Sequence, residues 1–168
     1  MTTSLRAHGI TAELPSGWEG RIAKPARSAP KVGTLPATAA TLDAEVVMPF
    51  AHFANMSLPA KMDSFGGGAV ERLADDKVLI CLVEYSPECV GTALFSGRSL
   101  PRKLSPRDFH RRSLQRILPG QTGSQTFLTE SGRPFCLYVV AGSFLRIGSM
   151  VRQVNAVLRG IQIAPGAG

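Results

Sequence analysis

The stretch that decides the fold is QTFLTESGRPFCLYVVAG, residues 125–142. It contains two apolar runs on either side of residues 130–133, Glu-Ser-Gly-Arg. Two β-prone runs around a short loop with a glycine are typical of a β-hairpin. The stretch therefore predicts two neighbouring antiparallel strands.

Further strands are indicated on the N-terminal side of this hairpin. The runs EVVMPFAHFANMSLP at 45–59 and KVLICLVEYS at 77–86 are rich in β-branched and aromatic residues and bounded by Pro, Gly and Asp, as core strands are. ITAELPSGWEGRIAK at 10–24 predicts two short strands around a turn, with Trp18 in the core, and TALFS at 92–96 predicts another strand. Between the two core strands, GGGAVERLAD predicts a glycine turn followed by one or two helical turns.

The sequence after the hairpin predicts an amphipathic helix. From Ser143 onward, apolar residues recur at steps of three and four, and Gly160 is expected to end the helix. The apolar stripe consists of Ile147, Met150, Val151, Val154, Val157, Leu158 and Ile161. We therefore expect an α+β fold in which an antiparallel β-sheet is flanked by helices. The C-terminal helix would pack on one face, and residues 104–118, partly helical, would lie near an edge or on the other face.

Length and composition favour one domain. A chain of 168 residues with 44% apolar and 18% charged residues is expected to bury a single core. We expect a flexible N-terminus at 1–9, a domain at 10–163 and a flexible tail at 164–168. Residues 25–44 are rich in Ala, Pro, Thr and Ser and predict a mobile loop within the domain.

The chain shows no sign of membrane insertion or export. Its longest clean apolar run, VLICLV at 78–83, is far shorter than the roughly 20 residues of a membrane span, and no signal peptide is recognisable. A cytoplasmic location is therefore expected. Cys81, Cys89 and Cys136 lack CxxC spacing, so reduced thiols are expected, with neither a disulfide framework nor a zinc site.

Positive charge is concentrated in GRSLPRKLSPRDFHRRSLQRILPGQ, residues 97–121, which we call the basic segment. It holds seven Lys or Arg residues and one acid, Asp108. Arginine forms bidentate pairs with carboxylate or phosphate, which favours a specific anionic partner. A solvated face, an acidic protein surface and a polyanion are the three alternatives. The residues expected to contact a partner are Arg98, Arg102, Lys103, Arg107, Phe109, Arg111, Arg112 and Arg116.

Catalytic signatures are weak. SFGGGAVERLA at 64–74 could present backbone N–H groups to a phosphate, but it completes neither a dinucleotide fingerprint nor a P-loop. The chain has no GxSxG elbow, and Asp108 with His110 is the only close acid and histidine pair. We assign no catalytic residue, no cofactor and no metal ligand. A small hydrolase or transferase that uses Asp108 and His110 is the least favoured function, and it requires a concave pocket that contains both.

Several motifs carry a resemblance. LPSGWEGRI at 14–22, together with FCLYVVAGSF through VNAVLRGIQI at 135–163, resembles the entry hairpin and the final strand and helix of the small α/β/α sandwiches of the PsbP-like and Mog-like group. With FGGGAVERL, LPGQTGSQTF and GRPFCLYVV, these motifs are also similar to uncharacterised proteins of actinobacteria. The resemblance implies a noncatalytic accessory subunit and supplies no site residue. The missing export signal departs from many PsbP-like proteins.

Composition and resemblance together predict an interaction subunit that docks on a larger protein assembly. The arginines would form the rim of the interface, and Phe109 or nearby leucines would form its desolvated centre. The alternative is binding to a polyanion, either a nucleic acid or an acidic membrane surface. Nucleic acid is the weaker possibility because only Phe109 and His110 could stack on bases.

Overall fold

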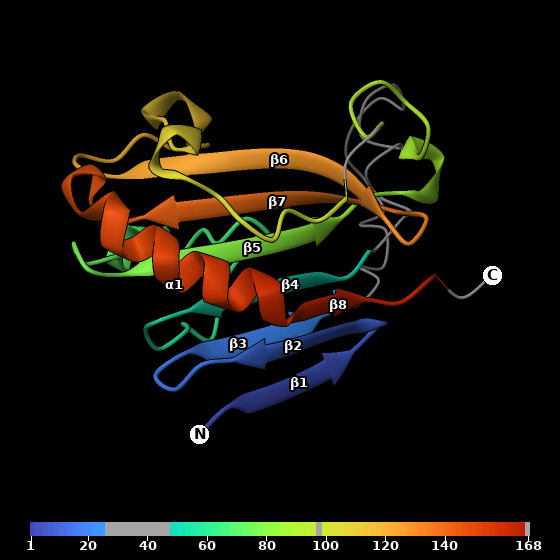
Figure 1. The fold of residues 1–168 in the computed structure, drawn as a ribbon, viewed down its shortest axis with the longest axis horizontal. Helices are drawn as coiled ribbons and strands as arrows, with labels where there is room; N and C mark the ends of the chain where they lie inside the picture. Colours follow the sequence, from blue (N-terminus) through green and yellow to red (C-terminus); the bar gives the residue numbers. More distant parts are fainter. Residues whose placement is uncertain (26–47, 97–98, 167–168) are drawn as a thin grey trace, which may run out of the picture.

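The computed structural model describes residues 1–25, 48–96 and 99–166, which form two antiparallel sheets and one α-helix (Figure 1). Two sequence predictions concern residues outside these ranges: the mobile loop at 25–44, of which only Pro25 is described, and the partner contact at Arg98. The α+β class is confirmed by this arrangement.

The predicted hairpin is confirmed as strands β6 (Thr122–Glu130) and β7 (Arg133–Ala141). They pair in register from Thr122 with Ala141 to Glu130 with Arg133. The two-residue turn between them places Ser131 at φ 52° and Gly132 at φ 73°. Two consecutive positive φ values are typical of the type I′ turn, whose twist matches that of the flanking strands.

The larger sheet has the strand order β3-β4-β5-β7-β6. Its remaining strands are β3 (Glu19–Ala23), β4 (Phe50–Ala54) and β5 (Val78–Glu84), and the last two confirm the predicted core strands. Every residue of β5 and β7 is buried. Strands that are buried along their whole length and are mostly apolar are expected where a sheet is covered on both faces.

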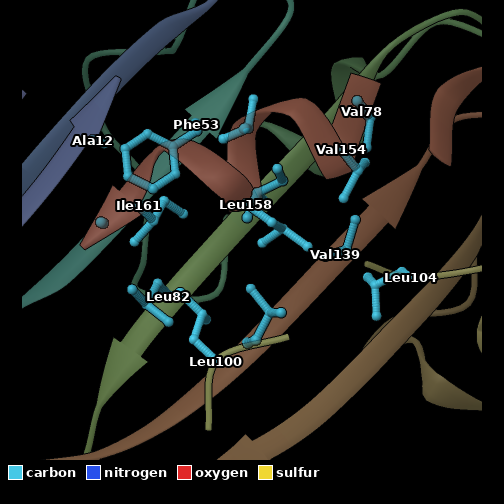
Figure 2. Close-up of a cluster of buried hydrophobic side chains, with 14 of the residues drawn as sticks. Ala12, Phe53, Val78, Leu82, Leu100, Leu104, Val139, Val154, Leu158 and Ile161 are labelled. Atoms are coloured by element: carbon cyan, nitrogen blue, oxygen red, sulfur yellow. The ribbon is translucent and has the colours of Figure 1, made fainter. Parts of the chain in front are cut away.

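Helix α1 (Ile147–Gly160) lies across one face of the larger sheet, as predicted, and Gly160 is its last residue (Figure 1). Figure 2 shows Val154 and Leu158 of this helix among side chains from the strands beneath. Burying an aliphatic side chain contributes about 1.5–3 kcal/mol, so the six buried apolar residues of α1 account for most of its stability in this context. They are Ile147, Met150, Val151, Val154, Val157 and Leu158.

The smaller sheet has the order β1-β2-β8, made from β1 (Thr3–Ala7), β2 (Ile10–Leu14) and β8 (Ile161–Ile163). The expectation of a flexible segment at 1–9 is wrong for 3–7, which pair with β2 along their whole length. The expected flexible tail also begins with a bonded residue, because the Ala164 N–H donates to the Gly9 carbonyl at 2.8 Å.

The two strands predicted at 10–24 are present, but the entry hairpin expected from the resemblance is wrong. Strand β2 pairs with β1 and β8, whereas β3 pairs with β4, so the turn at 15–18 connects two different sheets. The sheets approach each other at Gly20. A Cβ at Gly20 would lie 2.5 Å from Leu5 Cδ1 and 2.7 Å from Leu14 Cδ1, closer than such atoms can approach.

The second face of the larger sheet is covered differently from the expected sandwich. In the part of the chain that the structure describes, loops and single 3₁₀ turns pack on this face, and α1 is the sole α-helix. The helical stretch expected after the glycines is one 3₁₀ turn, η1 (Val70–Arg72). The strand predicted at 92–96 is wrong, because these residues form turns.

Candidate functional site

The described part of the basic segment, residues 99–121, wraps around the edge of the larger sheet. Leu100, Leu104 and Phe109 pack in the core beneath α1, while Leu114 packs on the opposite face. Between them, His110 forms an antiparallel bridge with Gly123 of β6, with its N–H 2.7 Å from the Gly123 carbonyl. The expected partial helix consists of two 3₁₀ turns, η3 (Pro106–Asp108) and η4 (Arg111–Ser113), which lie beside β6 at the upper left of Figure 1.

Two side chains hold this segment in place. The buried Asn155 of α1 accepts a hydrogen bond from the Leu104 N–H at 2.7 Å and donates one to the Leu104 carbonyl at 2.9 Å. Glu130 accepts a hydrogen bond from the Leu100 N–H at 2.6 Å. The backbone that carries the basic residues is therefore attached to both α1 and β6.

Three of the expected partner-binding residues contact other described residues, two of them in structural roles. Arg102 donates from Nη1 to the carbonyls of Leu158 (2.9 Å) and Ile161, so it caps the C-terminal end of α1. Cations are favourable there because the final carbonyls of a helix lack partners and the helix dipole is negative at this end. Phe109 is only 2% exposed and belongs to the core, so it cannot form the centre of an interface. Arg116 pairs with Glu71 at 3.2 Å.

Four expected residues remain at the surface, and we call them the basic patch: Lys103, Arg107, Arg111 and Arg112. All four are exposed, and none forms an ion pair with another described residue. The acid of this region does not neutralise them by direct contact, because Asp108 Oδ2 accepts hydrogen bonds from the Ser105 N–H (2.7 Å) and hydroxyl (3.0 Å). The patch thus presents positive charge that no described residue neutralises by a direct ion pair.

A shallow groove of about 790 Å³ adjoins the basic patch. Residues 99–104 line one side, and Ser124, Gln125 and Thr126 of β6 line another. Lys103, Arg107 and His110 contribute polar and charged groups to it. The groove therefore combines positive charge with the edge of a sheet.

The pair Asp108 and His110 lines this groove, but it does not form a catalytic unit. Both residues are exposed, and no hydrogen bond links their side chains within the described structure. A catalytic histidine needs a partner that orients it. The groove contains both residues, as the hydrolase or transferase interpretation requires, but the described structure shows no partner that orients the His110 imidazole.

The glycine-rich loop has its N–H groups occupied by its own acids. Asp63 Oδ1 accepts hydrogen bonds from Phe65 (2.9 Å) and Gly67 (2.8 Å), and Glu71 Oε2 accepts one from Gly68 (2.8 Å). Carboxylates thus hold the positions that a phosphate would need. The interpretation as a structural turn is favoured.

The buried titratable groups are placed as structural residues. Burial raises the pKa of the Cys136 thiol to about 11 and that of Cys81 well above its usual value. The imidazole of His52 is completely buried, with Nε2 3.0 Å from the Ser64 carbonyl, and burial is the main cause of its lowered pKa. The described residues contain no cluster of three or more His, Cys, Asp or Glu that could hold a metal ion.

Sequence reasoning missed the roles of Asn155 and Arg102. A signal for Asn155 was present, since a polar residue between Val154 and Val157 stands on the apolar stripe of the helix and must find a buried partner. For Arg102 no local signal exists, because the carbonyls that it binds are more than fifty residues away.

Comparison of the chain with protein-family models, curated proteins and solved structures finds no match. The resemblance to PsbP-like and Mog-like domains stays a prediction. None of the described helices has the length and apolar character to cross a membrane.

Proposed function

We propose that this protein is a noncatalytic accessory subunit that docks on an acidic protein surface through the basic patch. The observation that carries the proposal is the set of four exposed cationic side chains without an ion pair among the described residues, on a backbone held by α1 and β6. Three of the four are arginines, whose planar guanidinium groups pair with carboxylates in bidentate fashion.

A preformed backbone favours such docking. A segment whose main chain is already ordered loses less conformational entropy on binding than a disordered segment, so more of the contact energy appears as affinity. The clamp between Asn155 and Leu104 and the bridge between His110 and Gly123 provide this order. The cytoplasmic location expected from the sequence accompanies the proposal as a prediction.

Charge reversal tests the proposal. The variant Arg111→Glu, Arg112→Glu reverses two charges of the patch, and Arg152→Glu, Arg159→Glu reverses two exposed arginines of α1 as a matched control. Proteins captured from nuclease-treated extract of the source cell would be quantified by mass spectrometry. We expect defined acidic proteins to be lost with the patch variant and retained with the control. Equal recovery with both variants would contradict docking through the patch.

An anionic membrane surface is the second candidate, and a different observation favours it. Ile117, Phe144 and Leu145 are 56%, 54% and 92% exposed, and they stand next in sequence to Arg116 and Arg146. The Phe144 N–H donates to the Gly120 carbonyl at 2.8 Å, which brings the two apolar stretches to the same end of the molecule. Apolar residues flanked by cations can insert at an anionic bilayer.

Vesicle sedimentation separates the two candidates. A membrane role requires binding to vesicles that contain phosphatidylserine, with loss of binding in Phe144→Ser, Leu145→Ser. Protein docking requires that this variant keep its protein partners and that the wild type sediment no more with anionic vesicles than with neutral ones.

A further inference from the structure

Strand β6 is the outer strand of the larger sheet, and among the described residues no strand pairs with its outer edge (Figure 1). The two-residue turn makes Glu130 and Arg133 a hydrogen-bonded pair, so the even-numbered residues of β6 direct their N–H and C=O groups toward β7. The odd-numbered residues direct theirs outward. The bridge from Gly123 to His110 confirms this direction.

The outward groups beyond Gly123 are free within the described structure. No hydrogen bond from a described residue reaches the outward N–H or C=O of Gln125 or Phe127. Gln125 is exposed and lines the groove beside the basic patch. An edge of this kind is a template for pairing with another extended chain.

The charge around this edge selects the occupant. Lys103 and Arg107 line the same groove as Ser124, Gln125 and Thr126. Asp108 is the one acid among the residues that line it, and its Oδ2 is bonded to Ser105. A second copy of this chain would bring an identical set of cations, and like charges at an interface oppose pairing. An acidic segment would instead be attracted.

The two faces of the strand specify a pattern in that segment. Leu128 packs in the core on the α1 side, whereas Phe127 packs on the opposite side, with its ring 5.5 Å from Phe95 and 6.1 Å from Tyr85. Side chains of an added strand would alternate in the same way. Those on the α1 side would meet the basic groove, and those on the other side would meet the aromatic cluster.

We propose that the free edge of β6 binds an extended acidic peptide segment of the partner by strand addition, with acidic and apolar residues in alternation. Backbone hydrogen bonds at Gln125 and Phe127 supply the register, and the carboxylates pair with Lys103 and Arg107. The inference rests on the proposed function, since it describes how the same patch engages its acidic partner.

Direct titration tests the pairing. A fluorescent peptide of about ten residues with alternating Glu and Val, long enough to cover the free part of β6, would be titrated with the protein and followed by anisotropy. We expect saturable binding, and none for the same peptide with Lys in place of Glu. Gln125→Pro removes one outward N–H, which an edge strand tolerates because that group does not bond to β7. We expect it to weaken binding at least tenfold, while Gln125→Ala, which keeps the N–H, binds within twofold of wild type.

A second reagent leaves the protein unchanged, which covers the possibility that Gln125→Pro does not fold. Two peptides would be made, one N-methylated at the odd-numbered amides and one at the even-numbered amides, so that each lacks N–H donors along one edge. The peptide whose methylated edge faces β6 should lose binding, and the other should keep it. Equal binding by both, or binding by Gln125→Pro at wild-type strength, would overturn strand addition. The absence of peptide binding by the wild type would do the same. The proposed function would still hold in that case if the wild type captures acidic proteins and the charge-reversal variant of the basic patch does not. Binding of single-stranded nucleic acid or anionic vesicles in place of the peptide would overturn both.

Discussion

The guanidinium of Arg133 forms a buried ion pair with Glu84 and also connects the two sheets, so its removal should cost more than any other charge substitution in the described structure. The guanidinium donates from Nε to Glu84 Oε1 (2.8 Å) and from Nη2 to Oε2 (2.6 Å), and the two side chains are only 8% and 5% exposed. The same guanidinium donates to the carbonyls of His8 and Ala164, both at 3.0 Å. It therefore ties β5 and β7 to the ends of β2 and β8.

The magnitude follows from what each substitution leaves behind. Arg133→Met leaves a buried carboxylate without its partner and should lower the free energy of unfolding by about 3–5 kcal/mol. Glu84→Gln keeps an acceptor but removes a charge-assisted bond, so it should cost about 1.5–3 kcal/mol. In the double variant no unpaired carboxylate remains. Its cost should therefore fall short of the sum of the single variants by at least about 1 kcal/mol.

Urea unfolding of the four proteins, followed by circular dichroism, measures these values. Lys77→Met is the matched control, because Lys77 pairs with Asp76 at the surface and such pairs contribute at most about 1 kcal/mol. Amide hydrogen exchange in β2 should accelerate in Arg133→Met and not in the control. A cost below about 1 kcal/mol for Arg133→Met, or strict additivity in the double variant, would refute the reasoning.

Three further outcomes are expected. Asn155→Ala leaves the buried N–H and carbonyl of Leu104 unpaired, so it should lower the free energy of unfolding by about 2–4 kcal/mol. Proteolysis within 99–118 should also become faster than in the wild type, and an equal rate would contradict the role of Asn155 in holding this segment. Burial lowers the pKa of His52 in the folded protein, so as the pH falls the unfolded state takes up this proton first. The free energy of unfolding should therefore fall below about pH 6.5, by at most about 1.4 kcal/mol per pH unit. In urea titrations, His52→Gln should lose less stability over this pH range than the wild type. In a thiol-reagent assay at about pH 8, Cys89 should react in the native protein. Cys136 is buried and has a pKa of about 11, so it should react only after unfolding, and rapid labelling of every thiol in the native state would contradict the packing.

The elements that could be predicted are those with a local signal. The hairpin at 122–141 follows from two β-prone runs around a turn with glycine, and α1 follows from an apolar stripe at helical spacing. Strand β1 has no such signal, since TSLRA is mostly polar and exposed and is ordered by pairing with β2. The division of 10–24 between two sheets was equally hidden, because periodicity describes a strand and not its partner.

The candidate site shows the same limit. Charge counting located the basic segment correctly, but it treated every arginine as available. Arg102 is engaged by carbonyls at the end of α1, and Arg116 is engaged by Glu71. Phe109 interrupts a cationic run and looks like an exposed anchor, yet it reaches the core because the chain crosses the sheet edge at that point. The free edge of β6 was beyond prediction, since an edge exists only once the order of the strands is known.

By itself, the sequence determined the α+β class, the hairpin, the amphipathic helix and the concentration of positive charge, because each depends on residues close together in the chain. The tertiary structure alone decided which cations lack an ion pair with a described residue, that no described strand pairs with the outer edge of β6, and that one groove adjoins both. Those properties depend on contacts between residues far apart in the sequence, such as Arg102 with Leu158 and His110 with its place beside β6. Such contacts are selected by the packing of the whole chain, for which no local pattern of residues is sufficient.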